Sequence, residues 1–171
     1  MEILKIIQLA DDTIYSKDTS LRKPSEIVTD FGTEFQSEVD QLLEVFYSWK
    51  IAVGLSAPQV GIQKRFAIIN IDKSKPENTV VIVNPVIQSE SGKKDLKHES
   101  CLSIPQYRGV VERRKNTHIT FLDRYGEKKQ LSAEGFLARV YLHEIDHLNG
   151  ILFVDRMKPN DVLEKVETKW E

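Results

Sequence analysis

Two histidines and a glutamate near the C-terminal end of the chain have the spacing of a metal-dependent hydrolytic site. His143, Glu144 and His147 form the pattern H-E-x-x-H. On a helix, residues four apart lie one turn apart on the same face, so the two imidazoles could bind one ion. Glu144 would then lie beside that ion, where a carboxylate can take a proton from an attacking water molecule. The pattern predicts amide hydrolysis, although a surface helix can carry the same residues by chance.

A catalytic site of this kind needs a third protein ligand and one open position. The metzincin pattern fails because Phe153 occupies the place of its third histidine, although its glycine is present as Gly150. The gluzincin pattern needs a glutamate on a second long helix, and Glu164 and Glu167 lie in the right range. Only four residues follow Glu167, which leaves almost no chain for that helix. This alternative therefore ranks second.

The single cysteine of the chain, Cys101, is the remaining candidate. It cannot form an internal disulfide, and a thiolate is a strong ligand for zinc or iron. A lone cysteine is more often a small buried residue, but the hydroxyl residues and the proline around it are typical of a loop that presents a ligand. His98, three residues earlier, could instead complete a closed structural site with Cys101 and the two histidines.

The elements that must position these residues follow from hydrophobic periodicity. Helical spacing predicts an amphipathic helix within residues 32–50, and a second helix, capped by the hydroxyl of Ser132, carries His143 and His147. Runs typical of strands lie at 66–71, 79–83, 109–113, 117–123 and 128–131. A short last helix is expected over 161–170. The expected fold is α+β, with small antiparallel sheets packed around a central helix that carries H-E-x-x-H.

Length and composition favour one ordinary globular domain. With 171 residues the chain can close one hydrophobic core, so residues 1–171 are taken as a single catalytic domain. Its 40% hydrophobic and 29% charged residues and its formal net charge of -2 give no support for binding to nucleic acid or to a membrane surface. The longest apolar runs are strand-sized and the N-terminus lacks the layout of a secretory signal. We expect a cytoplasmic protein.

Three separated motifs resemble those of the peptide deformylase family. That family carries G-x-G-[LV]-A-A-x-Q, E-G-C-L-S and H-E-x-D-H in this order. The corresponding segments of this chain are Ala52–Gln59, Glu99–Ser103 and His143–His147. Three motifs are far more specific than H-E-x-x-H alone. The resemblance implies a metal-dependent hydrolase that removes the N-formyl group from the N-terminal methionine of nascent polypeptides and releases formate.

The resemblance also implies the catalytic roles. The family's metal ligands fall on Cys101, His143 and His147, with Glu144 as general acid and base. The oxyanion would be stabilised by the side-chain amide of Gln59 and by the backbone N–H of Leu102. Iron is the native metal that the family implies, as Fe²⁺, and Zn²⁺, Ni²⁺ or Co²⁺ could occupy the same ligands. The expected partner is an N-formylated peptide, and the C-terminal segment is a candidate contact with the ribosome.

Residues that bind the substrate are implied in the same way. The matching positions are Val53, Gly54, Ser100, Arg108 and Arg139. Ser100 replaces a glycine, so a positive φ at that place would strain it, and Ala52 and Ser56 are further departures. Arg139 and Lys97 fall on pocket positions that are commonly apolar, so we expect a weakened preference for an apolar first side chain unless their stems line the pocket. The alternative is a deformylase-like enzyme with a different N-acyl substrate.

Overall fold

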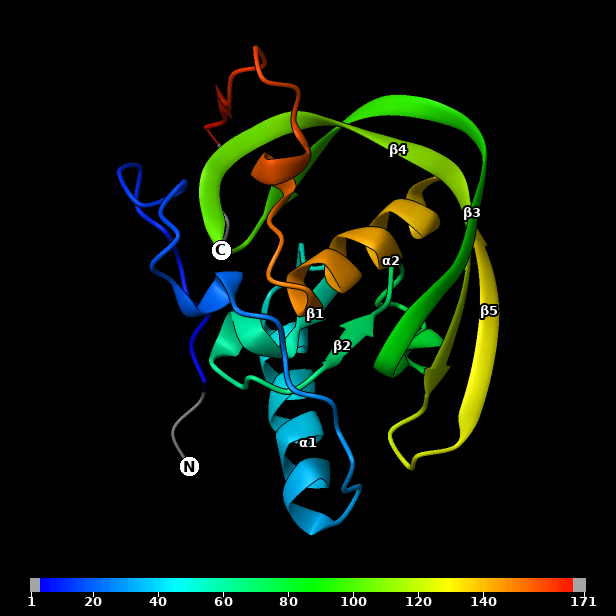
Figure 1. Ribbon diagram of the computed structural model, residues 1–171. Helices are drawn as coiled ribbons and strands as arrows, with labels where there is room; N and C mark the ends of the chain where they lie inside the picture. The colour runs from blue at the N-terminus through cyan, green and yellow to red at the C-terminus, as the bar shows by residue number, and fades with distance from the viewer. Residues whose placement is uncertain (1–3, 168–171) are drawn as a thin grey trace.

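The computed structural model describes residues 4–167, and its main feature is an antiparallel sheet that curves around a helix (Figure 1). The helices are α1 (Thr33–Ser48) and α2 (Gly135–Leu148). The strands are β1 (Gly54–Ser56), β2 (Phe66–Ile69), β3 (Val80–Cys101), β4 (Ile104–Leu122), β5 (Lys128–Glu134) and β6 (Glu164–Lys165). The strand order is β1-β2-β3-β4-β5 with β6 on β4, and each pair is antiparallel. The six strands thus form one sheet instead of separate small sheets.

The helix α2 is buried on nearly every side, which places it at the centre of the fold. Ala138, Leu142 and Ile145 are at most 3% exposed, and most of their neighbours on the helix are buried as well. A helix that is buried all round is typical of a protein core. In Figure 1 the long hairpin of β3 and β4 arches over α2. The α+β class and the central position of the H-E-x-x-H helix are therefore confirmed.

The two helices differ in how well the sequence predicted their ends. The apolar residues of α1 that recur at helical spacing are buried, and the helix begins and ends within one or two residues of the predicted limits. Ser132 does not cap α2. It belongs to β5, where it pairs with His118 of β4, and α2 begins at Gly135 with Glu134 as its N-cap residue. The predicted hydroxyl cap is wrong because the sheet continues three residues further than the local pattern indicates.

Two predictions about the strands are also wrong. β4 is one continuous strand, where two strands, 109–113 and 117–123, were expected. The segment expected to form a helix, 161–170, contains β6 instead, which pairs with Tyr107 and Arg108 of β4. The end of that segment, the candidate contact with the ribosome, lies partly outside the described residues. A helix this short is marginal without packing, whereas the edge of β4 supplies hydrogen-bond partners.

The N-terminal arm ties together two segments that carry predicted site residues. The N–H of Ile7 donates to the carbonyl of Gln59 at 2.7 Å, and the N–H of Leu9 donates to the carbonyl of Ser103 at 2.8 Å. Gln59 lies on the short 3-10 helix Ala57–Val60, and Ser103 lies in the turn between β3 and β4. The arm therefore holds these two segments at a fixed separation.

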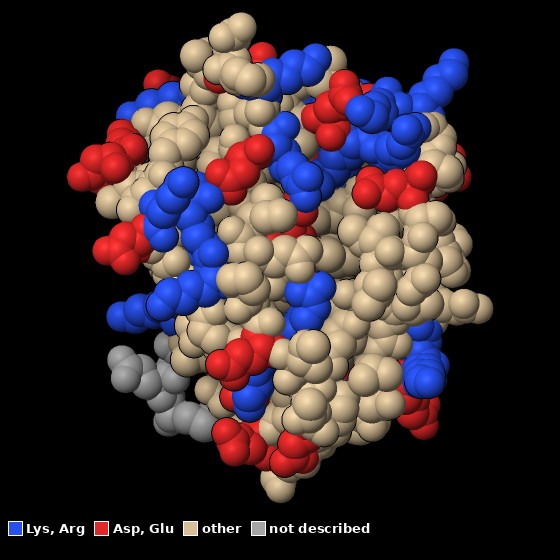
Figure 2. Space-filling model, viewed as in Figure 1, with Lys and Arg blue, Asp and Glu red and all other residues tan. Residues whose placement is uncertain are grey.

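The surface carries mixed charge. Figure 2 shows Lys and Arg side chains interspersed with Asp and Glu side chains over the visible face, in keeping with the formal net charge of -2. The face drawn in Figure 2 therefore shows no continuous positive area of the kind that attracts nucleic acid. Within residues 4–167, neither helix has the length and apolar character needed to cross a membrane.

Candidate active site

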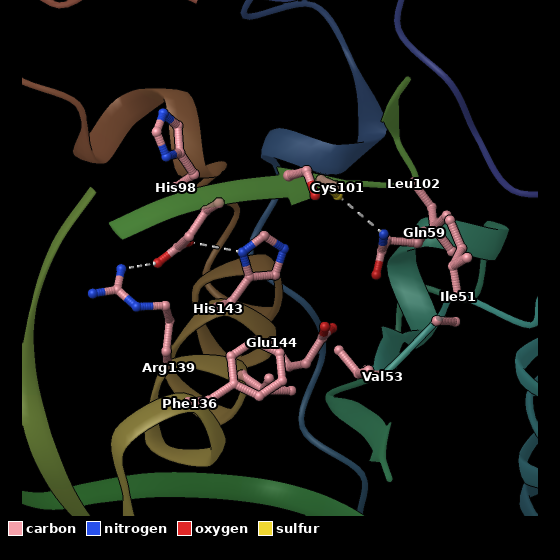
Figure 3. A pocket seen from close by; sticks show the side chains of 15 residues that line it. Ile51, Val53, Gln59, His98, Cys101, Leu102, Phe136, Arg139, His143 and Glu144 are labelled. Atoms are coloured by element: carbon pink, nitrogen blue, oxygen red, sulfur yellow. Dashed lines mark hydrogen bonds and ion pairs between the residues drawn. The ribbon is translucent and has the colours of Figure 1, made fainter. Parts of the chain in front are cut away.

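The three predicted metal ligands come together from two elements. Cys101 ends β3, and His143 and His147 lie one turn apart on α2; Figure 3 shows Cys101 and His143 at one pocket. Cys101 Sγ is 3.2 Å from His147 Nε2, which is 3.2 Å from His143 Nε2, and all three ligand atoms lie within 4.8 Å of one another. Bonds of about 2.0 Å to nitrogen and about 2.3 Å to sulfur place ligand atoms roughly 3 to 4 Å apart, so one ion can contact all three.

The donor set suits a catalytic ion. Cys101 is 4% exposed and His147 1% exposed, and burial lowers the pKa of His147 well below its ordinary value. The His147 ring is therefore neutral, as a metal ligand must be. A thiolate with two imidazoles suits zinc or iron, and three protein ligands leave one position open. In the part of the chain that the structure describes, no second cluster of this kind occurs.

Glu144 lies beside the ligands, and one of its carboxylate oxygens is buried without a hydrogen-bond partner in the described part of the chain. The residue is 4% exposed and lines the same pocket as Cys101 and His143. Its Oε2 atom is buried and has no hydrogen-bond partner among residues 4–167. Burial raises the pKa of this carboxyl to about 7. A carboxyl group with a pKa near neutrality can accept a proton and return it, which is what a general acid and base must do.

Gly54 leaves the room that the Glu144 side chain occupies. A Cβ atom at Gly54 would lie 2.4 Å from Glu144 Oε1 and 2.8 Å from its Cδ. Contacts this short are not tolerated between atoms that are not bonded, so the carboxylate would have to move away. The position of the Glu144 side chain is therefore a structural reason for glycine at position 54. The predicted contact between the Gly54 backbone and a peptide stays a prediction.

Gly54→Ala is expected to keep the fold and the metal while its kcat falls at least about tenfold, since a catalytic group misplaced by about 1 Å can cost up to 10²-fold. Metal content and the rate of formate release, measured on the same preparation, check this. Gly32→Ala, next to α1 and outside the pocket lining, is the matched control and should keep the parent rate. Equal rates for Gly54→Ala and the parent would contradict the steric argument.

The side-chain amide of Gln59 is held in one orientation. Its Oε1 accepts hydrogen bonds from the backbone N–H and the hydroxyl of Ser56, each at 2.9 Å. Because a backbone N–H can only donate, the atom facing it must be the oxygen, and Nε2 faces the other way. Nε2 donates to Ser103 Oγ at 3.2 Å and to Cys101 Sγ at 3.4 Å. The amide thus directs its N–H groups at the ligand site, and Ser56 takes part in holding it.

The predicted oxyanion-stabilising and substrate-binding residues mostly line this same pocket. Those that do are Val53, Gly54, Gln59, Ser100, Leu102 and Arg139. Ser100 is not strained, because the described residues other than glycine with a positive φ are Asn84 and Gln106. Ile51 and Phe136 also line the pocket and are 45% and 60% exposed, and the sequence did not single them out as pocket residues.

Four residues considered for the site lie outside the ligand cluster. Arg108 does not line the pocket and binds Glu164 instead, with Nε 2.9 Å and NH2 2.8 Å from Oε2. The other oxygen of Glu164 lies 3.1 Å from His98 Nε2, and neither residue belongs to the metal cluster. Glu167, the other candidate for the gluzincin ligand, does not belong to the metal cluster either. The gluzincin site and the closed site with four protein ligands are therefore wrong. Contact between Arg108 and a peptide stays a prediction.

Arg139 lines the pocket, but its charge is paired. Figure 3 shows its guanidinium group turned toward a carboxylate, and the NH1 nitrogen donates to Glu99 Oε1 at 2.7 Å. The NH2 nitrogen donates to Asp95 Oδ1 at 2.9 Å. Lys97 is exposed and does not line the pocket. The premise of two unpaired cations beside the first side chain of the substrate is therefore wrong.

Glu99 is the main site residue whose role the sequence did not reveal. Its Oε2 lies 3.0 Å from His143 Nδ1, and it accepts two hydrogen bonds from Arg113, at 2.6 and 3.0 Å. Burial would raise the pKa of Glu99, but the hydrogen bonds from His143 and Arg113 hold it far below its ordinary value. An ionised carboxylate can only accept, so Nδ1 of His143 carries the hydrogen and Nε2 is left for the metal. The available signal was its place two residues before Cys101, on the same face of a strand.

Comparison with known proteins identifies the family to which this site belongs. The family model described as polypeptide deformylase matches residues 5–162. The chain belongs to the polypeptide deformylase family. The resemblance carried by the three motifs is therefore confirmed, and with it the metal site of Cys101, His143 and His147.

Relatives and solved structures of this family cover nearly the whole chain. The peptide deformylase of Halothermothrix orenii is 40% identical over 157 residues, which is 92% of this chain and 95% of that protein. The crystal structure of peptide deformylase from Thermotoga maritima has a TM-score of 0.80 at 32% identity and covers 93% of this chain and 100% of its own. The peptide deformylase structure from Legionella pneumophila has a TM-score of 0.80 at 37% identity, covering 92% of this chain and 88% of its own.

Proposed function

We propose that this chain hydrolyses the formamide bond at the N-terminus of newly made polypeptides that begin with formylmethionine. The observation that carries the proposal is the meeting of the ligand cluster, Glu144 and the Gln59 amide in one pocket. The family match over residues 5–162 supports one catalytic domain over residues 1–171. The proposed location is the cytoplasm, where such polypeptides are made.

We propose one divalent ion per chain, with Fe²⁺ as the native metal and Zn²⁺, Ni²⁺ or Co²⁺ as ions that the same ligands accept. The support is the donor set of one thiolate and two imidazoles, which suits these metals better than magnesium or calcium. An ion bound there would lower the pKa of a water molecule and polarise the formyl oxygen. The hydrogen bond from His143 Nδ1 to Glu99 keeps that ring oriented for the ion.

In the proposed reaction, the carboxylate of Glu144, which lines the pocket, accepts a proton from water while the water oxygen bonds to the formyl carbon. Negative charge then develops on the formyl oxygen. The proposed donors to that oxygen are Gln59 Nε2, whose orientation Ser56 holds, and the backbone N–H of Leu102. Glu144 returns the proton to the peptide nitrogen as the carbon–nitrogen bond breaks. The products are formate and a free amine.

The proposed substrate lies along β1 with its first side chain in the pocket. β1 is an edge strand that pairs with β2 on one side, so an extended peptide could add to its other side by hydrogen bonding between backbones. Ile51, Val53 and Phe136 offer apolar surface around the first side chain. Because the charge of Arg139 is paired, we propose that the pocket prefers an apolar first side chain such as methionine.

The test is formate release from formyl-methionyl peptides by iron-loaded protein prepared without oxygen. We expect one formate for each new free amine, and little release of acetate from the matching acetyl-methionyl peptide. Comparable release of acetate would favour the alternative of a different N-acyl substrate. Protein that holds its metal and releases neither acid would overturn the proposal.

A further inference from the structure

Arg139 lines the substrate pocket and also takes part in a buried network of hydrogen bonds. It lies on α2 one turn before His143, and it lines the pocket while being 6% exposed. Its NH1 nitrogen donates to Glu99 Oε1 at 2.7 Å and to the carbonyl of Val111 at 2.9 Å. Its NH2 nitrogen donates to the side chain and the carbonyl of Asp95, at 2.9 and 3.1 Å. Four hydrogen bonds therefore hold this guanidinium between β3 and β4.

The partner of Arg139 is the carboxylate that orients a metal ligand. In Figure 3 the dashed lines from Arg139 and His143 meet at one carboxylate, which is that of Glu99. Its Oε1 receives Arg139 and Arg113, at 2.7 and 2.6 Å, and its Oε2 receives Arg113 and His143, each at 3.0 Å. The guanidinium groups of Arg113 on β4 and Arg139 on α2 thus fix the orientation of the Glu99 carboxylate. That orientation determines the position of Oε2, which accepts the hydrogen bond from His143 Nδ1.

We propose that Arg139 is a positioning residue for the metal site, acting through Glu99 on His143. The same side chain is part of the pocket lining, so pocket composition and metal affinity are coupled in this protein. The effect of Arg139 on metal affinity is inferred from the ligand cluster alone. Its part in the substrate pocket rests on the proposed function. An aliphatic residue at position 139 would line the pocket equally well but would leave Arg113, within residues 4–167, as the one guanidinium group bound to Glu99.

The decisive variant is Arg139→Met, which keeps an unbranched stem at the pocket and removes the guanidinium. Loss of an outer partner of a metal ligand costs roughly 10- to 100-fold in affinity, and Arg139 acts one contact further out, so we expect Zn²⁺ to bind about fivefold more weakly. Affinity is measured by competition with a chelator, which needs no substrate. Phe136→Leu is the matched control: it also changes the pocket lining, has no hydrogen bond to Glu99, and should keep the parent affinity.

Asp95→Asn separates the two roles. Asp95 does not line the pocket and its side chain is 28% exposed, so this variant loosens the outer anchor of Arg139 and leaves the pocket lining intact. We expect a fall in Zn²⁺ affinity of about twofold, smaller than for Arg139→Met because the other bonds of the guanidinium remain. The ratio of kcat/KM between formyl-Met and formyl-Gln peptides should not change in this variant.

Two results would overturn the inference. One is a parent-like Zn²⁺ affinity in a folded Arg139→Met protein, and the other is an equal loss of affinity in Phe136→Leu. If Arg139→Met does not fold, as judged by its thermal unfolding, Asp95→Asn decides, and unchanged affinity there rejects the positioning role. Because these readouts follow metal binding, they are independent of whether the protein releases formate.

Discussion

Cys101→Ala is expected to lose tight metal binding, with the affinity for Zn²⁺ falling by more than about 100-fold, because a direct ligand contributes more than the outer partners that cost roughly 10- to 100-fold. The thiolate is one of three protein ligands, and its Sγ lies 3.2 Å from His147 Nε2. The two histidines alone would hold an ion by two bonds from one helix. Chelator competition and metal content after dialysis, both under anaerobic conditions, measure the loss.

His98→Ala and Glu164→Ala are the matched controls for this experiment. Both residues were candidate ligands, and the structure pairs them with each other, with His98 Nε2 3.1 Å from Glu164 Oε1. Each variant should keep one equivalent of metal at the parent affinity. If Cys101→Ala bound the metal as tightly as the parent while Glu164→Ala released it, the glutamate would be the third ligand and the assignment of Cys101 would be refuted.

Glu144→Gln is expected to keep the fold and one equivalent of metal, whereas the rate of formate release should fall by roughly 10²- to 10⁴-fold, the range that general acid-base catalysis supplies. The amide has nearly the same shape as the carboxylate, so it fits against Gly54. It cannot take the proton of the attacking water. Metal content, thermal unfolding and kcat on a formyl-methionyl peptide, determined for the same sample, separate the loss of catalysis from a loss of metal.

The control for Glu144→Gln is the same substitution at an exposed carboxylate. Glu112 on β4 lies 2.7 Å from Lys94 at the surface and does not line the pocket. Glu112→Gln should therefore keep the parent kcat. A Glu144→Gln protein with full metal content and the kcat of the parent would remove Glu144 from the mechanism.

Buried ion pairs connect the helix that carries the histidine ligands to the hairpin of β3 and β4. Arg113 on β4 donates to Glu99 on β3 and to Asp146 on α2, the latter at 2.9 Å. Asp146 also accepts from Arg156 at 2.6 Å. Buried charges are costly unless each has a partner, and here the carboxylates and guanidinium groups alternate. The aspartate inside H-E-x-x-H therefore ties the ligand helix to the hairpin, a role that its place between two ligands did not indicate.

The sequence by itself determined the features that depend on neighbours along the chain. Two histidines four residues apart must share a helix face, so the pair of ligands on α2 followed from spacing. The same periodicity predicted α1 within two residues of its limits. The third ligand followed from the lone cysteine and its motif, and three motifs in order identified the family that residues 5–162 match. Each of these inferences needs local geometry or residue identity alone.

The tertiary structure decided the partners of the charged residues. Glu99 meets Arg113 and Arg139 from 14 and 40 residues away, which requires the register of β3 on β4 and the position of α2 beneath them. A long cationic side chain can reach several acceptors, and the one it binds depends on which of them the fold buries beside it. The sequence therefore predicted an unpaired charge at Arg139, although in the fold this charge is paired with Glu99 and Asp95.

The same reason explains the C-terminal segment. Its sequence favoured a helix over 161–170, but β5 covers β4 at residues 116–122 and leaves the edge of β4 near Tyr107 and Arg108 unpaired. Backbone groups at an exposed edge bond to any extended segment within reach, and β6 takes that place. Whether such an edge exists is a property of strand pairing over the whole chain, which local periodicity does not contain.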